Sequence, residues 1–476
     1  MLKQFLASAG LVVSTGLLIS SNLVNATEHP PEHSPEVQHL AQAIRFETVS
    51  HQQLNEIDYQ SFHDFRAFLK TTYPNVFSQL QVDTISNHSL LIQWQGSDNS
   101  LKPVLFEAHY DVVPIEEGTL QDWQHPPFSG VIEEGYLWGR GSLDDKISVI
   151  TSLEAMEQLL KEGYSPERTL LFAFGHDEEI GGRQGAKKIA EHLIQKNIEL
   201  EYVIGEGGLL INDHPILPTS TVAMIALAEK SYLTLTLNAK GEGGHSSAPL
   251  QNSAVVRLAK AVSALDDNPF EAKLVSPVSE MLLAFAPHVG MVESFLFSNQ
   301  WLSEPLLVSK MSEARMTNPL VRTTTAVTMF NAGVKENVVS QQAHAKVNFR
   351  LLPGDTSEQV LARVTELIND TSIEIIADSW GDSPKVANMN AEGYRRIQES
   401  IESELPDTIV TPGLLMATTD TRHYTQLTDD IYRFQPFTMH MDDSKTIHST
   451  NERVSLDAVV NAVAISRRLL MNVAKP

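Results

Sequence analysis

The feature that most constrains the fold is an alternation of strand-like and helix-like segments between residues 89 and 204. Short apolar runs are typical of buried strands, and the longer amphipathic stretches between them are typical of helices. This order predicts an α/β fold with a mostly parallel sheet. We expect strands at Ser89–Gln95, Pro103–Ala108, Thr169–Phe174 and Glu201–Ile204, and helices at Asp144–Glu162 and Gly182–Gln195.

A different pattern begins near Glu229 and predicts a second domain inserted into the first. Strand signals here alternate with only two helical segments, which indicates an α+β domain over residues 229–382. The first domain then comprises residues 36–228 and 383–476, with helical patterns at 36–73, 391–404 and 454–473. The inserted domain has strands at Ser231–Ala239, Thr323–Phe330, His344–Leu351 and Ser372–Ala377, and helices at Ser253–Leu265 and Ser357–Ile368.

Residues 270–320 are long, apolar and irregular. We favour the interpretation that they complete the core of the inserted domain. The alternative is that they line a pocket for an acyl chain or an apolar side chain of a substrate.

The first 26 residues have the pattern of a secretory signal. Lys3 gives a positive start, Phe5–Ile19 is largely apolar, and Val24-Asn25-Ala26 offers small residues for signal peptidase. An uncleaved anchor is the alternative, although the apolar run is short for a membrane span. Residues 27–35 are polar and proline-rich and are expected to form a flexible leader. We therefore expect an exported protein, periplasmic or secreted, without stable membrane insertion.

Charge and cysteine content restrict the partners and the ligands. The chain has 35 Lys and Arg against 59 Asp and Glu, a formal net charge of −24, which argues against nucleic acid and anionic membranes. It has no cysteine, so any transition-metal site must use histidine and carboxylate ligands.

Five short motifs place such ligands at the ends of predicted strands or in glycine-rich loops. Each has an ordinary explanation when taken alone: a structural His109–Asp111 hydrogen bond, a helix N-cap at Asp144, or an acidic loop at Glu178-Glu179. Together they supply two histidines and several carboxylates, which suits two hydrolytic zinc ions bridged by one carboxylate. The motifs contain His109 and Asp111, Asp144, Glu178 and Glu179, Glu206, and His448.

From about Val37 to the C-terminus, the chain resembles the two-zinc peptidase family of aminoacylase, acetylornithine deacetylase and glutamate carboxypeptidase. It is most similar to the Gly-Xaa carboxypeptidase and N-acyl amino acid hydrolase branch. This resemblance implies a zinc-exopeptidase-like catalytic domain and an inserted lid domain that often forms a homodimer. The matching segments are Phe106-Glu-Ala-His-Tyr-Asp-Val-Val-Pro114, Asn331-Ala-Gly-Val-Lys-Glu-Asn-Val-Val339, Val347-Asn-Phe-Arg350, Thr419-Asp-Thr-Arg422 and Ile447-His-Ser-Thr-Asn-Glu452.

The resemblance also implies a role for each matching residue. His109 and Glu206 would hold one zinc ion, Glu179 and His448 the other, and Asp144 would bridge them through a loop with a cis peptide to Asp145. Cobalt or manganese could substitute for zinc. Asp111 would orient His109, Glu178 would be the general base, and His245 of the lid would reach the substrate carbonyl, from the partner subunit in dimeric relatives.

The implied reaction is hydrolysis of an amide bond in a short dipeptide or an N-acyl amino acid with a free C-terminal carboxylate. Arg350 and Arg422 are the candidates for binding that carboxylate, with Asn337 as a polar helper, although either arginine could instead form a structural ion pair. A deacylase or an aminopeptidase acting on another amide is the enzymatic alternative, and a non-catalytic binding protein is the remote one.

Two positions depart from the family pattern. Position 205 is glycine where many relatives have aspartate beside the ligand glutamate, and position 147 is isoleucine where many have glycine. At position 205 we expect weaker support behind the ligand Glu206 rather than loss of the metal.

Overall fold

The computed structural model describes residues 31–249, 251–379, 381 and 384–476. The expected signal segment 1–26 and residues 27–30 of the expected leader lie outside this part of the chain. Residues 31–33 form a single 3-10 turn, and the first helix, α2, begins at Pro35. No described helix is long and apolar enough to span a bilayer.

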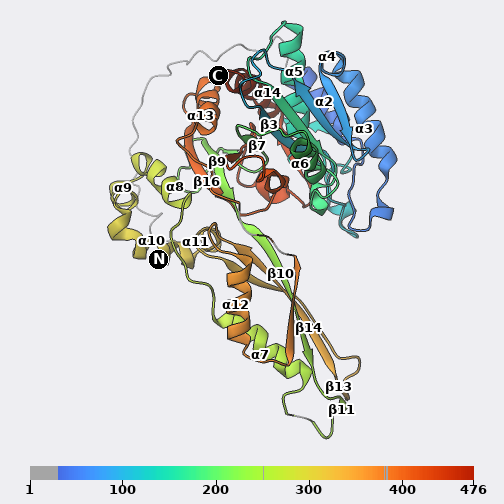
Figure 1. Ribbon diagram of the computed structural model, residues 1–476, viewed down its shortest axis with the longest axis vertical. Coiled ribbons are helices and arrows are strands. Elements are labelled where there is room, and N and C mark those ends of the chain that lie inside the picture. Colours follow the sequence, from blue (N-terminus) through green and yellow to red (C-terminus); the bar gives the residue numbers. More distant parts are fainter. Residues whose placement is uncertain (1–30, 250, 380, 382–383) are drawn as a thin grey trace.

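A ten-stranded sheet with a parallel centre forms the larger domain (Figure 1). Its strands lie in the order β1-β2-β6-β3-β7-β17-β9-β8-β18, with β16 paired to β9. The strands β6, β3, β7 and β17 run parallel, whereas β1, β2 and β8 add antiparallel pairs. The strands are β1 (Gln81–Ile85), β2 (Ser89–Trp94), β3 (Val104–His109), β6 (Leu170–Gly175), β7 (Val203–Gly205), β8 (Leu210–Ile211), β9 (Val222–Glu229), β16 (Ile409–Leu415), β17 (Ile431–Arg433) and β18 (Thr438–Met439).

Helices cover both faces of this sheet because its strands are apolar on both sides. Successive residues of a strand point to opposite faces, so Phe106 packs in the core on one face and Leu105 in the core on the other. The first core includes α2 (Pro35–Ile44), α3 (Tyr59–Thr72), α4 (Pro74–Gln79), α5 (Lys146–Lys161), α13 (Glu392–Glu404) and α14 (Leu456–Val473), and the second includes α6 (Ala186–Gln195). A separate three-stranded sheet, β19 (Arg453–Ser455), β5 (Tyr136–Trp138) and β4 (Val131–Glu133), flanks the domain.

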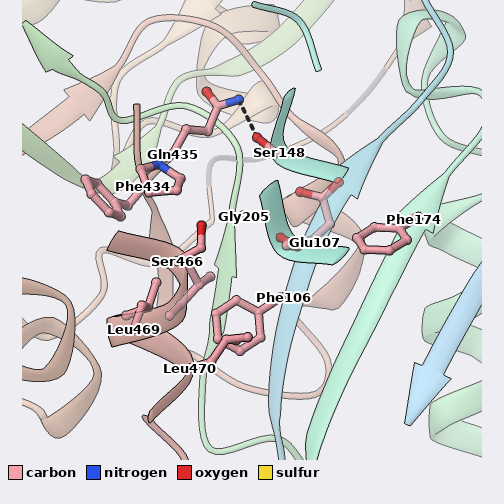
Figure 2. Close-up of a pocket in the computed structure, with 13 residues that line it drawn as sticks. Phe106, Glu107, Ser148, Phe174, Gly205, Phe434, Gln435, Ser466, Leu469 and Leu470 are labelled. Atoms are coloured by element: carbon pink, nitrogen blue, oxygen red, sulfur yellow. Dashed lines mark hydrogen bonds between the residues drawn. The ribbon is translucent and has the colours of Figure 1, made fainter. Parts of the chain in front are cut away.

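The α/β architecture predicted from the sequence is confirmed, with a sheet more mixed than its central strands suggest. The helical pattern at 36–73 is divided between α2 and α3. The irregular stretch between them brings Ser50 to the end of β3, where its hydroxyl donates to Asp111 at 2.8 Å. A small cavity remains between β3, β7 and α14 (Figure 2).

The second domain is a four-stranded antiparallel sheet that projects from the first (Figure 1). Two helices, α7 (Ala254–Asp267) and α12 (Ser357–Ile368), pack on it around a core that contains Leu235, Val347 and Leu258. The chain enters this domain directly after β9, at Glu229-Lys230-Ser231. The sheet order is β12 (Thr324–Ala332), β14 (Gln342–Leu351), β10 (Ser231–Lys240) and β15 (Ile373–Ser379). A two-stranded ribbon of β11 (Gly244–His245) and β13 (Val338–Val339) lies at its far end.

Residues 270–320 correct one prediction. They form α8 (Val278–Phe285), α9 (Met291–Ser298), α10 (Gln300–Glu313) and α11 (Asn318–Val321). The buried side chains of α8 and α10 pack with Val222 and Leu414 of the large sheet. The interpretation that this segment completes the core of the inserted domain is therefore wrong, because α8 packs beside β16 of the large sheet instead (Figure 1), and α10 adds Leu307 to the same cluster.

Candidate metal centre

The carboxyl ends of the central parallel strands gather the candidate ligands at one edge of the sheet. His109 is the last residue of β3, and Glu206 directly follows β7. Glu178 and Glu179 open a short 3-10 turn, η4 (Glu178–Ile180), just after β6. Parallel strands end at the same edge, so residues from three distant segments converge there.

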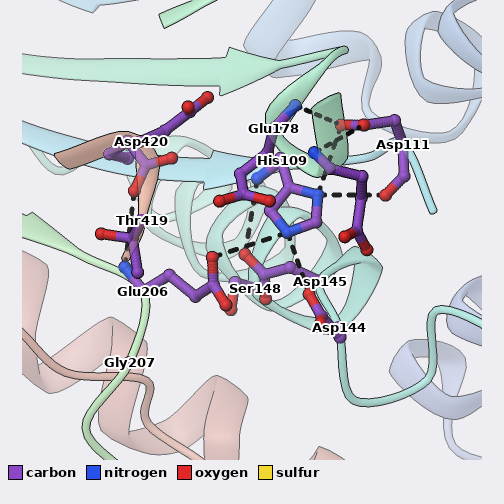
Figure 3. Close-up of polar contacts among 12 residues, drawn as sticks. His109, Asp111, Asp144, Asp145, Ser148, Glu178, Glu206, Gly207, Thr419 and Asp420 are labelled. Atoms are coloured by element: carbon purple, nitrogen blue, oxygen red, sulfur yellow. Dashed lines mark hydrogen bonds and ion pairs between the residues drawn. The ribbon is translucent and has the colours of Figure 1, made fainter. Parts of the chain in front are cut away.

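Two clusters of ligand atoms share Asp144. His109 Nε2 lies 2.9 Å from Asp144 Oδ1 and 3.5 Å from Glu206 Oε2. His448 Nε2 lies 3.0 Å from Asp144 Oδ2 and 3.1 Å from Glu179 Oε2. In each cluster, all ligand atoms lie within 4.8 Å of one another. The two oxygens of Asp144 thus face different histidines, which is the arrangement that a bridging carboxylate requires. Figure 3 shows the first cluster, in which Asp144 and Glu206 lie beside His109.

The chemistry of these atoms fits two divalent cations. Imidazole and carboxylate ligands suit zinc and its first-row neighbours. Glu206 Oε2 is buried and has no hydrogen-bond partner among the described residues, only the ion-pair contact with His109. Hydrogen bonds to Asp144 and Glu179 raise the pKa of His448 to about 10, so these carboxylates already stabilise a positive charge at this position. The side chain of His448 is 52% exposed whereas that of His109 is fully buried, so solvent reaches the centre from the His448 side.

Asp111 connects the ligand histidine to the glutamate turn. His109 Nδ1 lies 3.0 Å from the Asp111 carbonyl oxygen and 3.4 Å from its Oδ1. The same carboxylate accepts the backbone N–H groups of Glu178 at 3.1 Å and Glu179 at 3.2 Å. Burial alone would raise the pKa of Asp111, but its hydrogen bonds, chiefly the one with His109, hold the pKa below its ordinary value. Asp111 therefore fixes both the imidazole and the backbone that carries Glu178 and Glu179.

Glu178 lies beside His109 and Glu206 (Figure 3) and belongs to neither cluster. Burial, and then the neighbouring Glu206 carboxylate, raise the pKa of Glu178 well above its ordinary value of 4.5. A carboxylate with a raised pKa is a stronger base than an exposed glutamate. The position and the chemistry of Glu178 are thus those of a proton acceptor rather than of a ligand.

Several residues that support the centre were given no role in the sequence analysis. The buried carboxylate of Glu452 accepts the backbone N–H groups of Gly141 at 3.0 Å, Leu143 at 2.9 Å and Asp144 at 3.3 Å, and it pairs with Arg140. It thereby fixes the loop that presents Asp144, whose peptide bond to Asp145 is cis, as the resemblance implied. The sequence signal for Glu452 was its place in the Ile447–Glu452 motif. Glu107 and Asp420, also buried near the ligands, lie in the matching Phe106–Pro114 and Thr419–Arg422 segments but were given no role there.

The candidates for substrate binding fall in two separate places. Arg350 and Arg422 lie at the junction of the two domains, where Arg350 Nη1 donates to Thr418 at 3.1 Å. His245 and Asn337 lie together at the ribbon at the far end of the inserted domain, where the Ser246 N–H donates to the Asn337 carbonyl oxygen at 3.2 Å. One chain in this arrangement therefore does not bring all four residues to its own metal centre.

Two adjoining cation sites that share one carboxylate, with a buried glutamate beside them, define a metal-dependent hydrolase. Comparisons with known proteins agree with this class. Residues 105–472 match Peptidase family M20/M25/M40. The chain is 39% identical over 446 residues to Probable carboxypeptidase S-like 2 of Dictyostelium discoideum, which covers 92% of this chain and 85% of that protein.

Two further similarities extend over most of the chain. It is 36% identical over 441 residues to N-fatty-acyl-amino acid synthase/hydrolase PM20D1 of Mus musculus, covering 91% of this chain and 86% of that protein. Its fold resembles that of the M20 family metallo-carboxypeptidase Sso-CP2 from Sulfolobus solfataricus, with a TM-score of 0.67, 18% identity, and coverage of 92% and 99%. The chain belongs to the M20/M25/M40 peptidase family, which confirms the resemblance seen in its motifs. It is a metal-dependent hydrolase of amide bonds.

Removing the metal is expected to make stability depend steeply on pH. In the metal-free protein, burial raises the pKa of Glu179 to about 7 and that of Asp420 to about 8. The folded state then binds more protons than the unfolded state between about pH 4 and pH 8, so the free energy of unfolding falls as pH rises through this window. Bound cations offset the carboxylate charges and should flatten this dependence.

The measurement is the melting temperature of metal-free and zinc-loaded protein between pH 5 and pH 8. We expect zinc to raise the melting temperature by an amount that grows with pH. An increase that shrinks as pH rises would contradict the burial of these carboxylates at a cation site.

Proposed function

We propose that this protein uses two zinc ions to hydrolyse the amide bond of N-acyl amino acids or short dipeptides that carry a free C-terminal carboxylate. The observation that carries the proposal is the division of the Asp144 oxygens between His109 and His448. The names of the relatives, a carboxypeptidase and an N-fatty-acyl-amino acid hydrolase, support this substrate class. In both kinds of substrate, the amine half is an amino acid with a free carboxylate.

The residues of the metal centre have separate roles in the proposed reaction. His109, Asp144, Glu206, Glu179 and His448 would hold the two cations, which supply Lewis acidity that lowers the pKa of water and polarises the amide carbonyl. Glu178 accepts the proton of the attacking water because its buried carboxylate has a raised pKa. It then passes that proton to the leaving amine. Asp111 keeps the Glu178 backbone in place through the N–H hydrogen bond.

Arg350 is the better candidate for binding the substrate carboxylate. Arg422 donates to the carbonyl oxygens of Thr419 at 2.6 Å and Gly181 at 2.9 Å, so its guanidinium holds the segment after Glu179. Arg350 stacks 4.7 Å from the centre of the Tyr232 ring and reaches the other domain at Thr418. A guanidinium at a domain junction offers paired donors to a carboxylate that enters between the domains.

A substrate panel tests the proposal. We expect turnover of N-acyl amino acids and blocked dipeptides with a free carboxylate, and much weaker turnover of the same compounds capped as carboxamides. Arg350→Met should raise KM for the free acids by about 10- to 100-fold, because it removes a hydrogen bond to a charged group, and should change KM for the capped compounds little. Equal activity on free and capped compounds would instead favour a deacylase or an aminopeptidase of another amide.

We also propose that the active unit is a homodimer formed through the inserted domain, in which His245 acts on the centre of the partner subunit. Strand β10 has ten residues and runs away from the domain junction, which corresponds to about 30 Å at 3.3–3.4 Å per residue. His245 lies beyond the end of this strand and is exposed. In this arrangement, its imidazole cannot reach the metal centre of its own chain.

Mixed dimers test the role of His245. We expect His245→Ala to lower kcat by about 10²–10³-fold, as the loss of an oxyanion donor does, and His109→Ala to be inactive. Co-expression of the two variants should restore about a quarter of wild-type activity, because random pairing gives half heterodimers with one complete centre of two. The absence of any restored activity in isolated heterodimers would contradict catalysis across subunits.

The same proposal includes export. The apolar segment Phe5–Ile19 and the small residues before Thr27 support a cleaved signal and a periplasmic or secreted location. An acidic protein without cysteine needs no oxidative folding after export.

A further inference from the structure

A small cavity lies directly behind the metal ligands, between β3, β7 and α14 (Figure 2). Its volume is about 30 Å³, which is enough for one ordered water molecule. The wall is apolar on the side of Phe106, Leu469 and Leu470. Glu107 and Ser466 add polar groups to this wall.

Two buried polar atoms at this cavity have no hydrogen-bond partner among the described residues. They are Glu107 Oε1 on β3 and Ser466 Oγ on α14. Glu107 is 6% exposed and Ser466 is 5% exposed, so bulk solvent does not satisfy them. A buried carboxylate oxygen and a buried hydroxyl beside a water-sized cavity are the usual setting of a bridging water molecule.

The other carboxylate oxygen of Glu107 faces the metal ligand Glu206. The Glu206 N–H points at Glu107 Oε2 from 3.4 Å. A Cβ atom added to Gly205 would lie 2.6 Å from the same oxygen and would also collide with Thr421 Cγ2. The space that a side chain at position 205 would need is therefore filled by a carboxylate from the neighbouring strand. Glycine at 205 and glutamate at 107 form a complementary pair.

We propose that Glu107 is a positioning residue for the metal ligand Glu206, and that a buried water molecule links Glu107 Oε1 to Ser466 Oγ. Glu107 accepts the Glu206 N–H and places a carboxylate behind the cation site of His109, Asp144 and Glu206. The water anchors that carboxylate to α14. This arrangement supplies, from β3, the support behind Glu206 that glycine at position 205 cannot give. The inference rests on the two-cation centre proposed above.

Zinc affinity, measured by competition with a chromophoric chelator, tests this role without using turnover. Wild-type protein should bind two zinc ions per chain. Glu107→Leu should weaken one of the two sites by about 10- to 100-fold, the usual effect of losing a group that supports a ligand. Glu107→Gln keeps a carbonyl acceptor for the Glu206 N–H and should recover most of this loss. Ser466→Ala should fall between wild type and Glu107→Leu.

Adding Glu107→Leu to two variants that each keep one zinc site shows which of the two sites is affected. In His448→Ala, the remaining zinc binds at the His109 site, and adding Glu107→Leu should weaken it. In His109→Ala, the remaining zinc binds at the His448 site, and adding Glu107→Leu should leave its affinity unchanged. Equal weakening in both backgrounds, or in neither, would overturn the positioning role.

A matched variant separates positioning from general stability. Glu157 is also a buried carboxylate with hydrogen-bond partners, at Asn75 and Val76, and it is no ligand of either cluster. Glu157→Leu should lower the melting temperature and leave both zinc affinities at wild-type values. If Glu107→Leu behaves like Glu157→Leu, the inference fails while the two-cation centre stands. A wild-type chain that binds fewer than two zinc ions would overturn the proposed function itself. A high-resolution crystal structure without water between Glu107 and Ser466 would overturn the bridging water.

Discussion

Glu178→Gln is expected to lower kcat by about 10²–10⁴-fold, the usual contribution of a general base, while both cations remain bound. The amide keeps the size of the side chain and one acceptor oxygen, but it cannot take a proton from water. The cations should stay because Glu178 belongs to neither ligand cluster. Asp111 should still hold the backbone at residue 178, because this hydrogen bond uses the main-chain N–H.

The neighbouring glutamate provides the control for this variant. Glu179→Gln removes a ligand and should lower both the zinc content and the turnover, whereas Glu178→Gln should lower turnover alone. Metal analysis after gel filtration and steady-state kinetics on one N-acyl amino acid distinguish the two. Substantial turnover in Glu178→Gln, or loss of a cation from it, would disprove its assignment as the base.

Asp144→Ala should have the largest effect of any ligand substitution because it removes one group from each cluster. We expect fewer than one zinc ion per chain and a loss of activity of about 10⁴-fold or more, since several kcal/mol of transition-state stabilisation by the cations disappear. His109 and His448 also lose their closest carboxylate, at 2.9 Å and 3.0 Å. Zinc content and kcat/KM provide the measurement.

An exposed aspartate serves as the comparison for Asp144. Asp442 is exposed, pairs with Lys445 and belongs to neither ligand cluster, so Asp442→Ala makes the same change in charge without removing a ligand. It should keep two zinc ions and full activity. Retention of both zinc ions by Asp144→Ala would show that the two sites do not share this carboxylate.

The sequence predicted the central strands and the ligand candidates because both follow local patterns. An apolar strand followed at once by His109, or by Gly175 and the two glutamates, is visible in a short window, and parallel pairing brings such strand ends together. The structure places the five ligand candidates in the two clusters that result. Helix positions also followed from periodicity, although α5 and α6 begin later than expected, at Lys146 and Ala186.

The structural features that the sequence could not predict depend on contacts between segments far apart in the chain. The Glu452 carboxylate accepts the backbone N–H of Gly141, which lies 311 residues earlier in the chain. No local sequence pattern predicts this contact. The role of Glu107 emerges only when β3 and β7 lie side by side and the missing Cβ of Gly205 leaves room. The apolar faces of the helices after residue 270 would suit either the inserted domain or the large sheet, so their sequence does not show which of the two they cover. Only the final packing decides between these partners.

The order of the strands also determines how the chain can assemble as it is synthesised. Strand β17 lies between β7 and β9, yet it is made after the whole inserted domain. The inserted domain is one continuous segment and can fold as soon as it emerges. The larger sheet lacks the strand between β7 and β9 until β17 has been made, and its metal centre is incomplete until His448 has been made. A nascent chain can therefore acquire neither its complete sheet nor its full set of ligands until long after the inserted domain has been made, so a product that ends before His448 lacks a complete metal centre.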